Sequence, residues 1–162
     1  MFLSRSIRRL AAAGGAFFLA SCAAEDITVP KQVPLEEQVW AASLQVNLAQ
    51  FTKLPSGVYY LDEVAGTGET LTGTPTISVY YAAYLPNGTK VDERASTTTP
   101  VCFPLSGLIG GWQVGLQGMK IGGKRRLLVP PDYGYGAGGA GPIPGNANLL
   151  FNVELKGTGC TP

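Results

Sequence analysis

The feature that most constrains the fold is the recurrence of apolar residues at every second position over residues 76–85 and 148–156. A period of two gives a β-strand one apolar face. Shorter runs of the same kind occupy residues 58–64, 90–105 and 125–129, and a Thr- and Pro-rich stretch interrupts the second of these. Turn-forming Gly, Pro and Asn separate the runs. The sequence therefore predicts five antiparallel strands.

Residues 109–119 are the one stretch inside this region that favours a short helix. Strands with a helix to cover them belong to the α+β fold class. A chain of 162 residues is long enough for one such domain plus a short appendage. We expect the domain to occupy residues 54–162.

Residues 1–21 have the pattern of a secretory signal peptide. Arginines precede an apolar run over residues 10–20 that is too short to cross a membrane as a helix. The segment ends in Leu-Ala-Ser-Cys, which resembles the bacterial lipobox, and its cysteine is Cys22. We expect Cys22 to be lipidated and to anchor the chain in the bacterial cell envelope, with the domain in the periplasm and the anchor in the outer membrane. An ordinary signal peptide with a chance cysteine is the alternative.

Residues 22–53 are expected to connect the anchor to the domain. Pro30 and Pro34 follow small residues and indicate a spacer. Over residues 35–51, apolar side chains recur at near-helical spacing, which predicts a short amphipathic helix. We expect its apolar stripe to pack on the chain's own domain. The alternative is that it docks on a second copy and forms a homodimer.

The two remaining cysteines are predicted to form a disulfide. Cys102 lies inside the domain, and Cys160 lies just after its last strand. An exported protein reaches an oxidising compartment, where such bonds persist. Two unpaired thiols are the alternative, because spacing along the chain does not set the distance that the bond requires.

Several kinds of functional site are excluded by the composition. The chain has no histidine, so Ser-His-Asp and Cys-His arrangements are absent. No group of Cys, Asp and Glu has the compact spacing of a zinc site, and we expect neither a metal nor a cofactor. The net charge of +1 argues against nucleic acid as a partner. Glycine-rich stretches at 118–124 and 134–139 resemble nucleotide-binding loops, but the helix that would hold a phosphate does not follow either.

Aromatic and apolar motifs remain, and they occur in a specific order. They are Val79-Tyr80-Tyr81, Gly88-Thr89-Lys90-Val91-Asp92, Leu108-Ile109-Gly110-Gly111-Trp112, Pro131-Asp132-Tyr133-Gly134-Tyr135-Gly136, Ile143-Pro144 and Leu149-Leu150-Phe151-Asn152-Val153-Glu154-Leu155. In this order and spacing they resemble the FKBP-type peptidyl-prolyl isomerases across residues 54–157. The lipobox is similar to that of bacterial envelope members of this family.

The resemblance implies a five-stranded antiparallel sheet curled around one short helix, with a pocket between them. It implies that Trp112 is the pocket floor, and that the backbone N–H of Ile109 and the hydroxyl of Tyr135 hold substrate carbonyls. Asp92 matches the family's pocket carboxylate. Tyr81 and Phe151 match walls of the catalytic pocket. The residues expected to complete the substrate-binding surface are Val91, Val101, Leu108 and Ile143.

The implied reaction is rotation about X-Pro bonds in exported, unfolded polypeptides. Its barrier of about 18–20 kcal/mol comes from amide resonance. A twisted amide loses its dipolar resonance form, so it tolerates an apolar pocket better than the planar amide does. The reaction moves no protons, which fits a chain without histidine.

Two departures from the family pattern bear on turnover. Val91 and Val101 stand where the family commonly has Phe, so two walls of the pocket are expected to be smaller. A chaperone-like module that binds proline peptides with weak or no turnover is therefore the alternative function. For an isomerase pocket, a macrolide inhibitor is a further expected ligand.

Overall fold

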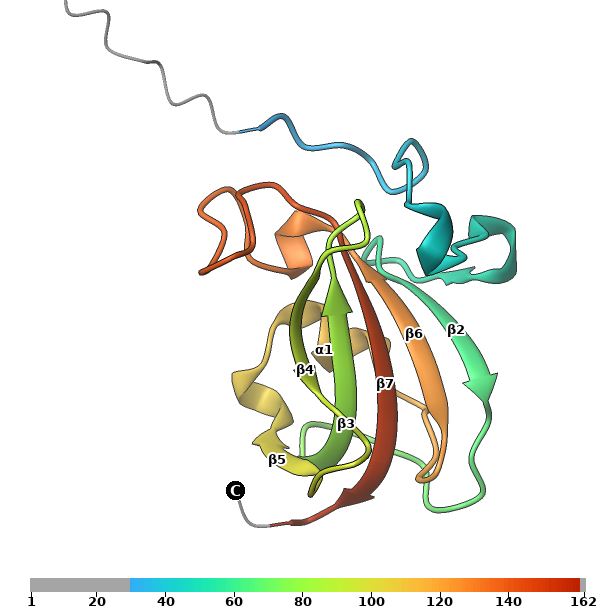
Figure 1. Cartoon of the computed structure of the whole chain (residues 1–162). Helices are drawn as coiled ribbons and strands as arrows, with labels where there is room; N and C mark the ends of the chain where they lie inside the picture. Colours follow the sequence, from blue (N-terminus) through green and yellow to red (C-terminus); the bar gives the residue numbers. More distant parts are fainter. Residues whose placement is uncertain (1–29, 161–162) are drawn as a thin grey trace, which may run out of the picture.

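The computed structural model describes residues 30–160. Within this range the strands are β1 Thr52–Lys53, β2 Tyr59–Val64, β3 Thr76–Tyr84, β4 Lys90–Arg94, β5 Val101–Pro104, β6 Lys124–Val129 and β7 Leu149–Thr158. They form one antiparallel sheet in the order β1-β2-β6-β7-β3-β4, and β5 also pairs with β3. The prediction of an antiparallel sheet with one short helix is confirmed (Figure 1). The expected signal peptide and Cys22 lie outside the described residues.

The third predicted strand is present as two pieces. β4 pairs with the second half of β3, and β5 pairs with the first half. The Thr- and Pro-rich residues 95–100 form the loop between them, and the hydroxyl of Tyr80 on β3 donates to the carbonyl of Thr98 in that loop. β5 therefore lies at a free edge of the sheet, paired only with β3 among the described strands.

The helix α1, Gly110–Gly115, packs against one face of the sheet and is shorter than the predicted 109–119. Gly111 allows this close packing, because a Cβ there would lie 2.5 Å from a methyl carbon of Val129. The buried residues of this face include Val58, Ile77, Val79, Leu127, Phe151 and Leu155. They form the main core of the domain.

Arg125 on β6 holds the C-terminal end of α1 in place. Its guanidinium donates to the carbonyls of Gly115 and Gln117 at 2.8 and 2.9 Å, and it pairs with both carboxylate oxygens of Asp62 on β2. The side chain is 5% exposed, so these bonds compensate a charge that is nearly removed from water. The position of α1 relative to the sheet is thereby fixed at both the glycine contact and the arginine.

Residues 30–51, which we call the N-terminal arm, cover one end of the opposite face of the sheet (Figure 1). Leu128 on β6 and Leu150 on β7 are cross-strand neighbours on this face and are fully buried beneath it. From the arm, the buried residues Leu35, Leu44 and Phe51 complete this second cluster. The predicted packing of the arm on the chain's own domain is therefore present in the structure.

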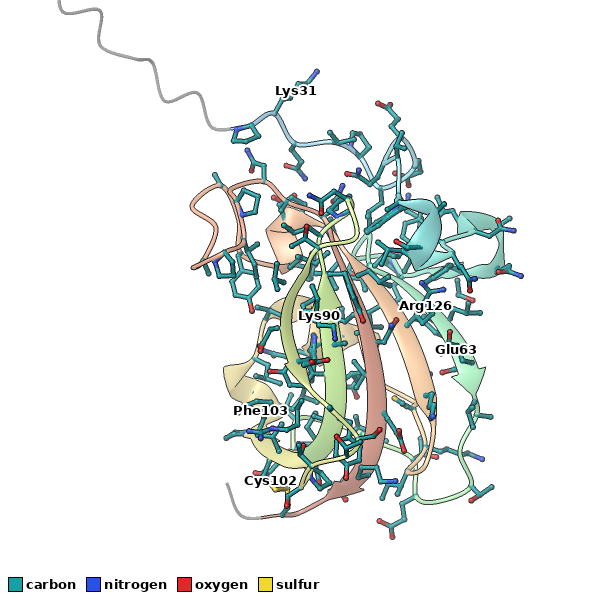
Figure 2. The ribbon with its side chains drawn as sticks, in the orientation of Figure 1. Lys31, Glu63, Lys90, Cys102, Phe103 and Arg126 are labelled. Atoms are coloured by element: carbon teal, nitrogen blue, oxygen red, sulfur yellow. A yellow bond between two sulfur atoms is a disulfide. The ribbon has the colours of Figure 1, made fainter. Side chains whose placement is uncertain are left out.

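The predicted helix over residues 35–51 is wrong. The arm instead contains two single-turn 3-10 helices, Ala42–Leu44 and Leu48–Gln50. Arg126 on β6 gives the physical reason, because its guanidinium donates to the carbonyls of Leu44 and Gln45, which a continuous helix would use internally. Figure 2 shows Arg126 beneath the arm. Contacts with the sheet thus override a weak helical pattern.

The predicted spacer is also part of the domain from Pro30 onward. The side chain of Asn148 donates to the carbonyl of Val33 at 2.7 Å, and the side chain of Asn146 donates to the carbonyl of Pro30 at 2.7 Å. The prediction of a spacer is consequently limited to residues before Pro30, which lie outside the described range.

Cys102 on β5 and Cys160 beyond β7 form a disulfide, with Cα atoms 6.1 Å apart. In Figure 2, Cys102 lies beside Phe103 at the end of the sheet away from the arm. The bond attaches the free-edge strand β5 to the C-terminal segment, and so it supports a strand that has only one neighbour. No helix within residues 30–160 is long and apolar enough to cross a membrane.

The attachment of the arm is expected to weaken in acid. Glu36 accepts hydrogen bonds from Lys53 and from the hydroxyl of Tyr59, and these bonds lower the pKa of Glu36 from 4.5 to about 2. Because the folded-state pKa is depressed, the stabilisation is present above pH 4.5 and is lost as the pH falls from 4.5 through 2. The protection factors of the arm amides, which are hydrogen-exchange rates relative to the unfolded chain at the same pH, measure this loss between pH 7 and pH 2.5.

Glu36→Gln is expected to remove this pH dependence and to speed exchange of the arm at pH 7. The neighbouring Glu37→Gln serves as the control, because no side-chain partner of Glu37 is found in residues 30–160. It should keep the wild-type profile. Identical profiles for wild type and Glu36→Gln would contradict the assignment.

Candidate functional site

A cavity of about 230 Å³ lies between α1 and the sheet. Its lining residues are Tyr81, Asp92, Phe103, Leu108, Ile109, Trp112, Tyr135 and Phe151. The floor is Trp112, which lies in the first turn of α1 and is 4% exposed. Its ring meets the rings of Tyr81 and Phe151 edge to face, with centroids 5.5 and 5.6 Å apart. Three contacting aromatic rings thus form the floor and two walls of the cavity.

Each wall comes from an element whose local sequence fixes it. Tyr81 on β3 and Phe151 on β7 lie on the sheet face that α1 covers. The rim at Leu108 is held by Gln113, whose side-chain amide donates to the Leu108 carbonyl at 2.7 Å. Strand alternation and one helical turn therefore bring together residues up to 70 positions apart, from Tyr81 to Phe151.

Asp92 is the one charged residue that lines the cavity. It accepts a hydrogen bond from the hydroxyl of Tyr81 at 2.6 Å. Burial, and secondly this bond to the carboxylate, raise the pKa of Tyr81. Burial, and secondly the charge of Asp92, raise the pKa of Tyr135. Both phenols therefore keep their protons at neutral pH and act as hydrogen-bond donors.

Two donors at the mouth of the cavity are not engaged by other parts of the described structure. Within residues 30–160, neither the hydroxyl of Tyr135 nor the backbone N–H of Ile109 has a hydrogen-bond partner. Tyr135 is 38% exposed and contributes to the cavity from the loop over residues 131–147, which we call the flap loop. The site therefore presents an apolar floor and two free donors, the arrangement expected for holding a peptide with an apolar ring at its centre.

A second cavity of about 280 Å³ adjoins the first and shares Asp92, Tyr135 and Phe151 with it. Val91 and Ile143 line this second cavity and not the first. In residues 30–160, no group of three or more Cys, Asp or Glu side chains is placed to hold a metal ion.

Comparison with known proteins identifies the family. The family model described as FKBP-type peptidyl-prolyl cis-trans isomerase matches residues 68–156, more than half of the chain. The chain belongs to this family.

Named relatives agree with that assignment. A probable FKBP-type peptidyl-prolyl cis-trans isomerase of Haemophilus influenzae is 45% identical over 101 residues, which cover 62% of this chain and 42% of the relative. FK506-binding protein 2 of Aspergillus oryzae is 41% identical over 120 residues, covering 72% of this chain and 89% of the relative. The crystal structure of FkpA from Escherichia coli matches with a TM-score of 0.66 at 33% identity, over 75% of this chain and 56% of FkpA. The matched region thus spans less than half the length of the H. influenzae protein.

The lining of the cavity differs from the sequence prediction at one wall of this FKBP-type pocket. Val101 lines neither cavity and packs against the main core, whereas Phe103 lines the first cavity, with its ring centroid 6.1 Å from that of Tyr81. The two residues lie two positions apart on the same face of β5, opposite Val79 and Ile77. The period of two in the sequence indicates that Val101 and Phe103 both face the covered side of the sheet. It therefore makes Phe103 as well as Val101 a candidate for the wall. The first cavity therefore has an aromatic wall where a smaller one was expected.

The other nine predicted residues each line at least one of the two cavities. Tyr81, Asp92, Leu108, Ile109, Trp112, Tyr135 and Phe151 line the first cavity, and Val91 and Ile143 line the second. The structure thus brings together nine of the ten predicted pocket residues in two adjoining cavities.

Proposed function

We propose that the chain catalyses the cis-trans isomerisation of X-Pro bonds in unfolded, exported polypeptides. The observation that carries the proposal is the aromatic cavity over Trp112 with two free donors at its mouth. FKBP-type relatives with 39–45% identity support it. The proline ring would occupy the cavity, and the amide before it would lie at the mouth.

The residues of the site are suited to binding a twisted amide. Trp112, Phe103 and Phe151 surround the ring with apolar surface, which disfavours the planar, dipolar amide relative to the twisted one. The N–H of Ile109 and the hydroxyl of Tyr135 would hold carbonyls on either side of the rotating bond. Asp92 orients Tyr81 through their hydrogen bond. Rotation needs no proton transfer, so no general acid or base is required.

An isomerisation assay on a proline tetrapeptide tests the proposal. Wild type is expected to accelerate cis-to-trans conversion, and Tyr135→Phe is expected to lower kcat/KM by about two- to tenfold, the usual worth of one hydrogen bond. The control is Tyr133→Phe, because Tyr133 lies two residues away in the same loop and lines neither cavity. A wild-type rate equal to the uncatalysed rate would contradict the proposal. A pocket-filling macrolide is expected to inhibit the reaction.

Binding with little turnover is the second candidate, and it rests on the small side chains of Val91 and Val101, of which Val91 lines the second cavity. In that case the chain would suppress aggregation of an unfolded client, and Trp112→Leu would leave the suppression unchanged. Loss of suppression when a macrolide fills the pocket would count against this candidate. Phe103 weakens it, because the first cavity retains its aromatic wall.

We infer that Cys22 is lipidated and that the domain lies in the periplasm of a bacterial cell envelope, held at the outer membrane. The lipobox-like sequence before Cys22 supports this inference. Labelling with a radioactive fatty acid should mark wild type and not Cys22→Ala, and membrane fractionation should locate the labelled chain.

The apolar residues of the arm that could instead form a homodimer are largely buried against the chain's own sheet.

A further inference from the structure

The N-terminal arm contacts both ends of the flap loop. At the start of the loop, the side chain of Gln32 donates to Asp132 at 3.5 Å. At its end, Asn146 donates to the carbonyl of Pro30 at 2.7 Å. Figure 1 shows the arm, in blue, running across the same end of the sheet as the orange flap loop. Residues 30–38, which we call the strap, thus join the two ends of the loop that carries Tyr135.

The strap is fixed to the domain by Asn148, at the start of β7. This side chain is 2% exposed, and its amide nitrogen donates to the carbonyl of Val33 at 2.7 Å and to the side-chain oxygen of Gln38 at 2.9 Å. Buried hydrogen bonds of this kind are costly to break, because the groups would be left without partners. The strap therefore has a firm attachment immediately beside the flap loop.

Asn146 connects the strap to the position next to Tyr135. Its side chain holds Pro30, and its backbone N–H donates to the carbonyl of Gly136 at 2.8 Å. Its φ of +57° is a left-handed conformation that Asn adopts more readily than most residues. Asn146 thus links the strap and the end of the flap loop to the carbonyl of Gly136, the residue next to Tyr135.

The flap loop has backbone hydrogen bonds of its own, such as those from Gly136 to Pro131 and from Gly139 to Tyr135, but it is rich in glycine. It contains Gly134, Gly136, Gly138, Gly139, Gly141 and Gly145, and glycine has the largest backbone freedom of any residue. Ordering such a loop over a substrate costs conformational entropy, which a prior attachment lowers. A donor on this loop is useful for binding only where the loop is held in place.

We propose that the strap sets the position of the Tyr135 hydroxyl over the cavity, and that Asn146 is the positioning residue through which it acts. This inference rests on the proposed function for its kinetic consequence. The strap is then part of the substrate-binding apparatus, although none of its residues lines either cavity.

The kinetic test uses Asn146→Gly in the whole chain. Glycine keeps the left-handed conformation and the backbone bond to Gly136 but removes the bond to Pro30. KM is expected to rise about two- to fivefold, with kcat changed by less than about twofold. The control is Asn47→Gly, which removes a side-chain bond to Ala49 elsewhere in the arm and should leave both constants unchanged. An unchanged KM for Asn146→Gly would overturn the proposal.

A double-mutant cycle shows whether Asn146 acts through Tyr135. In a Tyr135→Phe background, Asn146→Gly is expected to have almost no further effect on KM, because the hydroxyl that it positions is gone. An equal KM increase in both backgrounds would mean that Asn146 acts by another route, and would overturn the assignment.

Hydrogen exchange separates failure of the strap from failure of the proposed function. Amides of residues 131–147 are expected to exchange faster in Asn146→Gly than in wild type, while those of β6 and β7 exchange at the wild-type rate. This result is expected whether or not the chain turns over substrate. If the wild type has no isomerase activity but the variant shows this exchange pattern, the proposed function alone is contradicted. If exchange of residues 131–147 is the same in Asn146→Gly and wild type, the proposed role of the strap is contradicted.

Discussion

Trp112→Leu is expected to lower kcat/KM by about tenfold or more. The indole forms the floor on which the proline ring would lie, and it makes edge-to-face contacts with Tyr81 and Phe151. A tenfold loss of kcat/KM corresponds to about 1.4 kcal/mol of transition-state stabilisation, and contact of the substrate's ring with a flat aromatic surface is worth about 0.5–1.5 kcal/mol beyond the area that it buries. Leucine keeps the site apolar but provides no flat surface and lets the neighbouring rings move. Measuring kcat/KM well below the unfolding temperature checks the result.

The chain offers a matched control in Trp40→Leu. Trp40 packs in the second cluster, on the sheet face opposite the cavity. Both substitutions are expected to lower the free energy of unfolding by about 1–3 kcal/mol, since each removes a large, mostly buried ring. Only Trp112→Leu should lower kcat/KM. An equal loss of kcat/KM in both variants would show that the effect comes from stability and not from the pocket floor.

The sheet was predictable because its period of two is long and clear in β3 and β7. Packing of the arm on the domain was predicted, but not that it covers part of the second face of the sheet, although the run Leu149-Leu150-Phe151 carries a signal for it. Leu150 faces the arm, whereas Leu149 and Phe151 face α1. Consecutive apolar residues in a strand indicate a sheet buried on both sides. The run at Leu127-Leu128-Val129 has the same explanation, so the two central strands together predict a second covering layer.

The pocket was largely predictable because its motifs follow a fixed order in the sequence. The difference at Val101 lies at the one wall that comes from an interrupted strand. β5 is attached to β3 alone among the described strands, so the sequence does not show which of Val101 and Phe103 reaches the cavity. The register with Ile77 decides it, because Phe103 lies opposite that residue. Strand register depends on contacts distant in sequence, which spacing does not encode.

The arm illustrates the opposite failure. Leu35, Leu44 and Phe51 have near-helical spacing, yet they are buried by an irregular segment that contains only single turns. A short helix has little stability of its own, so contacts with the sheet decide its conformation. The deciding contact is the buried Arg126, whose partners are arm carbonyls. In the sequence, Arg126 is indistinguishable from a charged residue at the start of a strand.

Removal of the disulfide is expected to cause the largest loss of stability. Cys102→Ser combined with Cys160→Ser should lower the free energy of unfolding by about 4 kcal/mol, the value that the chain-entropy model gives for a closed loop of this length. The two cysteines are 58 residues apart, so the bond removes much of the freedom of the unfolded chain. Denaturant unfolding of wild type and variant measures the difference. Wild type treated with a reductant should match the double variant, and the double variant should not respond to the reductant.

The same substitution connects stability to the pocket, because β5 carries Phe103 next to Cys102. β5 has one strand neighbour in the described structure, and the disulfide is its covalent attachment to the C-terminal segment. Without it, amides of β5 are expected to exchange faster than those of β6, and KM should rise because an aromatic wall of the cavity is less firmly held. A loss of stability below about 1 kcal/mol would contradict the entropic argument. Unchanged exchange in β5 would show that pairing with β3 alone suffices to hold Phe103 in the wall.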